Sequence, residues 1–239
     1  MRTIKHIPKP KTDTIYIIGT GPSLRLYPYG FFDDKYTIGL NQAYKLFDQT
    51  LSLTIHPYLI PVDHTQWNTV WVTKEKPHDP KYMDHMAVKN YERFILFVNS
   101  EDFNVFSQGS KENQLYVGRG IHTGAIHLAC ILGAKYIILV GCDFCALDGY
   151  HHSLDQHTEF HGKKPQDVYN EYYLYADKCR RLAKQYWNAE IFSMSPLLGL
   201  IDNVDVHILT KQKNLPPLEE PHDIEVTKRI TPLVTDYIP

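Results

Sequence analysis

A short apolar segment ends in a glycine turn that has the form of a phosphate-binding loop. Residues 14–18 (Thr-Ile-Tyr-Ile-Ile) indicate a buried strand and run directly into Gly19-Thr20-Gly21-Pro22-Ser23. When a helix follows such a turn, main-chain N–H groups and the positive helix end point at an anion. The dinucleotide-binding fingerprint would have its third glycine at Leu24, and no Gly-Lys-Ser/Thr follows. The pattern therefore predicts a nucleotide site that is neither an NAD site nor a P-loop, or else a plain tight turn.

Two further polar segments are expected at the same edge of the sheet. Asn41 and Gln42 follow the second predicted strand, and side-chain amides bond the neutral edges of bases and sugars. Open α/β sheets bind ligands at the carboxyl ends of their strands, which favours ligand binding over a simple cap or turn. Arg119 and Thr123 stand at the start of the predicted central helix, a cationic and hydroxyl-bearing edge that suits phosphate. Thr123 can equally serve as a helix cap.

A histidine-rich loop offers groups for acid–base chemistry. Residues 145–166 are polar, lack periodicity and contain His151, His152, His157 and His161. Histidine titrates near neutral pH, so one of these side chains can act as a general base. Their spacing does not match a compact zinc motif, and a solvated loop without a role is the other interpretation. A loop of this length in a compact domain is usually a functional lid or is disordered.

Carboxylates near this loop suggest a second chemistry. Asp143 follows a predicted central strand, and Asp148 and Asp155 lie in the loop. Carboxylates can hold Mg²⁺ for phosphoryl transfer, but Asp143 can also cap a helix or loop, which is the interpretation we favour. Cys142 and Cys145 form a C-x-x-C pair, yet no second pair completes a zinc site, so buried reduced thiols are expected.

The elements that must position these groups are those of a parallel sheet. Strands are predicted at 14–18, 35–40, 51–55, 70–73, 94–98, 135–141 and 189–194, and helices at 43–47, 123–132 and 168–186. This alternation predicts an α/β fold with a Rossmann-like, mostly parallel sheet flanked by helices and a loop-rich lid at about 145–166. We expect a single nucleotide-binding domain over residues 1–210 that opens with a basic leader arm at 1–13. A surface tail is expected at 211–239.

Composition limits the class of protein. The chain has 239 residues, of which 43% are hydrophobic and 22% charged, and its net charge is −2, as in an ordinary globular protein. A charge this close to neutral does not favour bulk nucleic acid as a partner. No segment has the length of a membrane span, so we expect at most peripheral membrane contact. Reduced cysteines and a start without an apolar leader predict a cytoplasmic location, and a homo-oligomeric state stays open.

Five short motifs resemble, in their order and spacing, those of bacterial sialyltransferases of glycosyltransferase family 42. They are Gly19–Leu24, Asn41-Gln42, Ile121–Gly124, Gly141–Phe144 and Ser195–Leu198. They are also similar to the related domain-of-unknown-function 115 proteins, which include an archaeal hydroxymethyl-dihydropterin pyrophosphokinase. The resemblance covers about residues 14–200. It implies a Rossmann-like sheet with a mobile lid, a CMP-sugar donor, no metal requirement, inversion at the sugar and a lid histidine as general base.

The resemblance also implies roles for single positions. The family's nucleotide-contacting positions fall on Thr20, Asn41, Gln42, His56, Arg119 and Thr123, and its two phosphate-holding tyrosines fall on Cys145 and Tyr150. Among the departures from the family, Thr20 replaces an asparagine and Cys145 replaces a tyrosine. These departures motivate a third hypothesis, a nucleotide-binding module without catalysis.

The sequence thus predicts a glycosyltransferase-like enzyme that transfers a sugar from a nucleotide donor of the CMP type to a glycan or small-molecule acceptor. It would invert the sugar and need no metal. The alternatives are a Mg²⁺-dependent phosphoryl or pyrophosphoryl transferase and the non-catalytic module. The general base is assigned to His161 or His157. Nucleotide binding is assigned to Gly19, Thr20, Gly21, Pro22, Ser23, Asn41, Gln42, His56, Arg119, Thr123, Gly124, Asp143 and Tyr150.

Overall fold

The computed structural model describes residues 2–27, 30–61, 63–75, 94–108, 113–144 and 164–194. Its strands are β1 (Arg2–Thr3), β2 (Thr14–Ile18), β3 (Thr37–Leu40), β4 (Leu51–Thr54), β5 (Val70–Lys74), β6 (Ile95–Ser100), β7 (Gln114–Tyr116), β8 (Tyr136–Val140) and β9 (Glu190–Ser193). Its α-helices are α2 (Phe103–Gln108), α3 (Ile121–Ile131) and α4 (Pro165–Trp187). Short 3₁₀ helices are η1 (Ile4–His6), η2 (Pro22–Leu26), η3 (Ala43–Lys45), η4 (Pro57–Leu59) and η5 (His64–Gln66).

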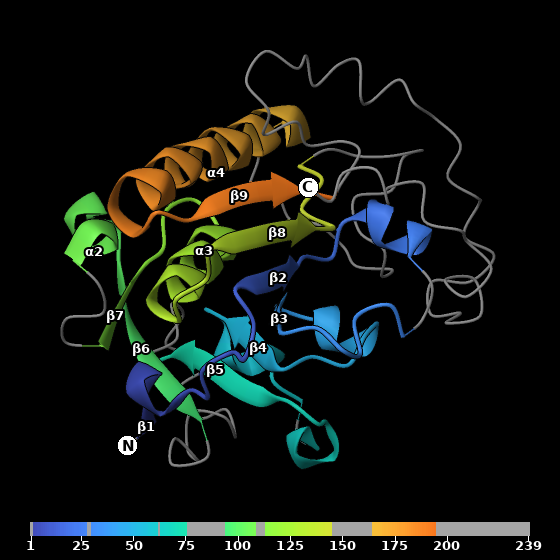
Figure 1. The fold of residues 1–239 in the computed structure, drawn as a ribbon. Coiled ribbons are helices and arrows are strands. Elements are labelled where there is room, and N and C mark those ends of the chain that lie inside the picture. The colour runs from blue at the N-terminus through green and yellow to red at the C-terminus, as the bar shows by residue number, and fades with distance from the viewer. Residues whose placement is uncertain are drawn as a thin grey trace.

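The described strands form one parallel sheet in the order β1-β6-β5-β4-β3-β2-β8-β9, with β7 also beside β6. From β2 the chain builds the sheet outward through β3, β4, β5 and β6. It then returns through α3 to place β8 on the other side of β2, as Figure 1 shows. The order of the strands therefore reverses between β2 and β8. In open α/β sheets such a switch point leaves a crevice at the carboxyl ends of the two strands. The α/β, Rossmann-like fold predicted from the sequence is confirmed.

Alternating side chains divide the core between the two faces of the sheet. Ile15 and Ile17 of β2 join one cluster of buried residues, whereas Ile18 of β2 joins another. Helix α3 packs on the first face against β2, β3 and β4, and α4 packs against α3 and β9 (Figure 1). On the second face, η2 and the aromatic side chains of Tyr27 and Phe32 cover β2 and β8. Both faces are covered, which explains why these strands are apolar throughout.

Helices α3 and α4 both end close to a residue with left-handed main chain. Helix α3 is buried from Ile121 to Cys130 and stops before Gly133, which has a φ of +90°. Helix α4 begins with Pro165 in its first turn and ends at Asn188, which adopts the left-handed conformation that terminates helices. Its inner face packs on the core through Ala176, Cys179 and Ala183. Cys179 belongs to the face that the apolar spacing predicted, but Tyr186, predicted to lie on the same face, is 50% exposed.

Most predicted elements are confirmed to within a few residues, and three expectations change. The residues expected to form a leader arm are part of the fold, because β1 pairs with β6 and Ile4 and Ile7 are buried in the core. The helix expected after the glycine turn is only the short 3₁₀ helix η2. The last residues of the expected lid belong to α4, while residues 145–163 and the tail lie outside the described residues. None of the described helices is long and apolar enough to cross a membrane.

The described cysteines are free thiols in the core. Cys130, Cys142 and Cys179 are all buried, as expected, and Cys145 lies outside the described residues. Burial raises the pKa of the Cys142 thiol to about 12, with a smaller contribution from the charge of Asp143. A thiol with this pKa is protonated at neutral pH and is a poor nucleophile or metal ligand.

Candidate functional site

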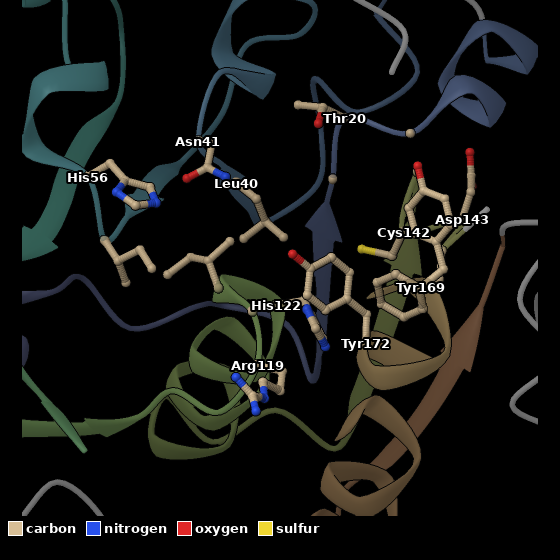
Figure 2. Close-up of a pocket in the computed structure, with 17 residues that line it drawn as sticks. Thr20, Leu40, Asn41, His56, Arg119, His122, Cys142, Asp143, Tyr169 and Tyr172 are labelled. Atoms are coloured by element: carbon tan, nitrogen blue, oxygen red, sulfur yellow. The ribbon is translucent and has the colours of Figure 1, made fainter. Parts of the chain in front are cut away.

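A cavity of about 270 Å³ opens at the switch point of the sheet. Its walls come from the carboxyl ends of β2, β3, β4 and β8, from the loop before α3 and from the first turns of α4 (Figure 2). The volume is close to the lower end of the range of small-molecule sites. The lining residues are Gly19, Thr20, Gly21, Leu40, Asn41, Ile55, His56, Arg119, Gly120, Ile121, His122, Gly141, Cys142, Asp143, Phe144, Tyr169 and Tyr172.

The glycine turn forms one wall and is bonded to the end of β8. The Gly19 N–H donates to the Val140 carbonyl and the Gly21 N–H donates to the Gly141 carbonyl, each at 2.7 Å. A Cβ atom at Gly19 would stand 2.3 Å from the Gly141 oxygen, so only glycine permits this approach. The sequence predicted that these glycines allow a close approach to a bound anion. The observed partner, however, is the neighbouring strand, and these two N–H groups are already engaged.

Asp143 occupies the place of an anion at the start of η2. Its Oδ2 accepts a hydrogen bond of 2.7 Å from the Ser23 N–H, and the Ser23 hydroxyl donates to its Oδ1. Both residues are buried, and Pro22 has no N–H to offer. Asp143 therefore has the capping role that the sequence analysis favoured over metal binding. Pro22 and Ser23 belong to η2 and do not line the cavity.

The ends of β3 and β4 form the adjacent wall. The Thr54 hydroxyl donates to Asn41 Oδ1, and the His56 N–H donates to that hydroxyl; both donor–acceptor distances are 3.0 Å. This bridge holds Asn41 and His56 side by side at the cavity. Asn41 was predicted there from its place after a strand, and His56 from the motif resemblance. Gln42 does not line the cavity, because its Oε1 accepts from the Lys45 ammonium at 2.5 Å.

Two residues with strained main chain line this cavity. Asn41 has a φ of 52° and Phe144 has a φ of 49°. Asparagine tolerates this left-handed conformation, but a bulky residue such as phenylalanine rarely adopts it. Strain of this kind costs about 1–3 kcal/mol and concentrates at functional sites. The position of Phe144 is therefore independent support for a functional role of the cavity.

The loop before α3 supplies the cation. Arg119 lines the cavity, and its Nε lies 3.5 Å from Glu171 Oε2 of α4. Its side chain is 57% exposed, so the guanidinium can reach a ligand. Thr123 has a structural role instead: its hydroxyl accepts from the Gly118 N–H at 2.9 Å and donates to the Gly120 carbonyl at 2.7 Å. Thr123 and Gly124 are buried in α3 and do not line the cavity.

Ten of the lining residues were not predicted to contact a ligand, and His122, Tyr169 and Tyr172 are among them. His122 is 4% exposed, and its ring lies near the rings of Phe144 (4.8 Å between centroids) and Tyr172 (5.7 Å). Burial lowers the pKa of His122 to about 4. Tyr169 and Tyr172 come from the first turns of α4. Of the two, only Tyr172 belongs to the apolar spacing that predicted the packing face of this helix. The spacing of three between them, on a helix that follows the lid, is the signal that would have identified them.

The remaining predicted residues lie outside the described part of the chain. Tyr150, His157 and His161 fall within residues 145–163, so their roles stay predictions. In the described ranges, no group of three or more His, Cys, Asp or Glu side chains is arranged to hold a metal ion. Seven of the predicted site residues therefore line the cavity: Gly19, Thr20, Gly21, Asn41, His56, Arg119 and Asp143.

A comparison of the chain with family models, with curated proteins and with solved structures found no match. The function is therefore inferred from the cavity and its chemistry.

Proposed function

We propose that this chain is a glycosyltransferase-like enzyme that binds a nucleotide-activated sugar in the switch-point cavity and transfers the sugar to a hydroxyl acceptor. One observation carries the proposal: residues from four strand ends and two helices converge on a single cavity at the place where α/β sheets bind nucleotides. The motif resemblance supports a CMP-type donor, inversion and independence of metal. Because the fold alone does not imply an activity, the chemistry of the walls must support it.

The charges of the two walls suggest how the donor is oriented. The turn after β2 is an unfavourable place for phosphate, because Asp143 is buried there and the N–H groups of Gly19, Gly21 and Ser23 have internal partners. A second anion near a buried carboxylate would be repelled. Arg119 lies apart from Asp143 in the view of Figure 2 and carries the opposite charge. The phosphate is therefore placed toward Arg119, and the uncharged parts of the donor toward Thr20 and Asn41.

The proposed reaction has a simple balance of atoms. The acceptor oxygen forms a bond to the anomeric carbon, and the bond from that carbon to the nucleotide phosphate breaks. The acceptor proton goes to a general base, assigned by the motif resemblance to His161 or His157, and the nucleotide leaves with the electron pair. Arg119 would stabilise the charge that develops on the leaving phosphate. Attack from the opposite face gives inversion.

A ligand panel followed by a turnover assay tests the proposal. We expect CMP, UDP or GDP to raise the melting temperature by several degrees, because a ligand at 100 times its Kd adds about 2.7 kcal/mol of stability. CMP-, UDP- and GDP-sugars with a set of glycan and small alcohol acceptors should then release free nucleotide. A parallel arm with ATP and MgCl₂ tests the phosphoryl-transfer alternative. If none of the three nucleotides shifts the melting temperature, the proposed function is wrong.

A further inference from the structure

His122 lines the cavity and has an unsatisfied, buried polar atom. The residue is 4% exposed, it lines the cavity, and its Nε2 has no hydrogen-bond partner among the described residues. Figure 2 shows the ring below that of Tyr172. A buried polar atom without a partner costs free energy. A bound ligand would recover that free energy by supplying the partner.

A second buried histidine shows that position, not burial alone, distinguishes His122. His127 lies one and a half turns further along α3 and also has an unpaired Nε2. Its Nδ1, however, accepts a hydrogen bond of 2.9 Å from the Tyr116 N–H, and its ring stacks on Phe106 at 4.9 Å. His127 does not line the cavity and is a residue of the core. It therefore provides a matched control.

The chemistry of an uncharged imidazole limits what it can bind. Desolvation lowers the pKa of His122 to about 4, an effect only partly offset by a main-chain hydrogen bond with Tyr172, so the ring is neutral at pH 7. A neutral imidazole nitrogen either accepts or donates one hydrogen bond, depending on its tautomer. A hydroxyl group satisfies both cases, because it donates and accepts. A phosphate only accepts and prefers a cation, which Arg119 supplies elsewhere in the cavity.

We infer that His122 is a specificity-determining residue whose Nε2 binds a ribose hydroxyl of the nucleotide, and not the phosphate. This inference rests on the proposed function. It implies that the site recognises the ribose of its ligand through the first turn of α3. A ligand without that hydroxyl would leave the Nε2 atom unpaired and would bind more weakly.

The test compares three substitutions by titration calorimetry, with CMP as the probe, or UDP or GDP if the wild type binds one of these more tightly. His122→Leu removes the polar atom, and we expect the Kd to rise about tenfold. His122→Gln places an amide near the position of Nε2 and should bind within about threefold of the wild type. His127→Asn keeps a hydrogen-bond acceptor near the position of Nδ1. It should lower the melting temperature without changing the Kd.

A phosphate probe separates hydroxyl recognition from phosphate recognition. Inorganic pyrophosphate at millimolar concentration should compete with the nucleotide in the wild type and in His122→Leu with the same inhibition constant. Two results would overturn the inference and leave the proposed function intact. The first is an unchanged nucleotide Kd in His122→Leu. The second is an inhibition constant of pyrophosphate that rises in His122→Leu by the same factor as the nucleotide Kd. A wild-type chain that binds none of the three nucleotides refutes both.

Discussion

Two walls of the same cavity use their polar groups in different ways. On the wall after β2, Gly19 and Gly21 bond to the main chain around β8, and Ser23 bonds to Asp143. On the wall before α3, Arg119 makes a long contact with Glu171, and His122 keeps an unpaired nitrogen. The first wall therefore holds the sheet together at the switch point. The second wall has more capacity left for a ligand.

The difference shows that a recognisable motif and a ligand contact need not coincide. The glycine turn is the clearest pattern in the sequence, yet much of its hydrogen-bonding capacity serves the fold. His122 lies in an inconspicuous position of a helix start, and the fold gives its Nε2 no described partner. Substitutions on the wall after β2 should therefore mainly lower the stability of the fold, and substitutions on the other wall should mainly weaken ligand binding.

The largest effect is expected at Gly19. Gly19→Ala would place a Cβ atom 2.3 Å from the Gly141 oxygen, a contact between two main-chain segments that cannot move apart without breaking the sheet. We expect a loss of about 3 kcal/mol or more in the free energy of unfolding, measured by urea denaturation.

Gly133→Ala is the matched control for Gly19→Ala. A Cβ atom at Gly133 would meet nothing within 4 Å, although its φ of +90° adds strain. The control should lose only about 1–2 kcal/mol. Equal losses for both variants would show that the turn does not depend on its close contact with β8.

A second effect is expected at the carboxylate cap. Asp143→Asn removes the charge from the hydrogen bonds with the Ser23 N–H and hydroxyl and should cost about 2 kcal/mol. A double-mutant cycle with Asp143→Ala and Ser23→Ala measures the coupling between the two side chains. A coupling energy near zero would contradict the assignment of Asp143 as the cap of η2.

Both buried histidines should make the stability of the fold depend on pH. Their pKa values in the fold are lowered to about 4 for His122 and about 3 for His127, below the ordinary value of 6.5. Between pH 6.5 and about 4 the unfolded chain binds more protons than the folded chain, so stability falls as the pH falls. Each histidine contributes a slope of up to about 1.4 kcal/mol per pH unit.

Urea denaturation at several pH values measures this slope. His122→Gln and His127→Asn should each remove part of the slope between pH 6.5 and 5, because neither replacement titrates. A slope in either variant equal to that of the wild type would show that the replaced histidine is already charged in the fold.

The smallest effect on stability is expected at Arg119. Its pair with Glu171 is long and partly exposed, so Arg119→Ala should change the free energy of unfolding by less than about 0.5 kcal/mol. Nucleotide affinity should nevertheless fall about tenfold, because the phosphate loses its cation. Glu171→Gln is the control and should not weaken binding. Unchanged affinity in Arg119→Ala would place the phosphate elsewhere.

Much of the fold is predictable because its signals are local. The apolar strands, the periodicity of α4 and the stop at Gly133 depend on residues near one another in the chain. The same reason explains why β1 and β7 were missed. Each is only two or three residues long, and each exists because β6 offers an unpaired edge that the local sequence does not reveal.

The sequence by itself determined which groups follow the ends of strands, because a parallel sheet brings those ends to one edge. That rule correctly placed Gly19, Asn41 and Asp143 at one cavity. Only the tertiary structure decided what each group does there. Ser23 meets Asp143 across 120 residues of chain, and His122 becomes a neutral buried ring because Phe144 and Tyr172 pack beside it. Such contacts depend on the order of the strands and on helix packing, and no local pattern of residues encodes them.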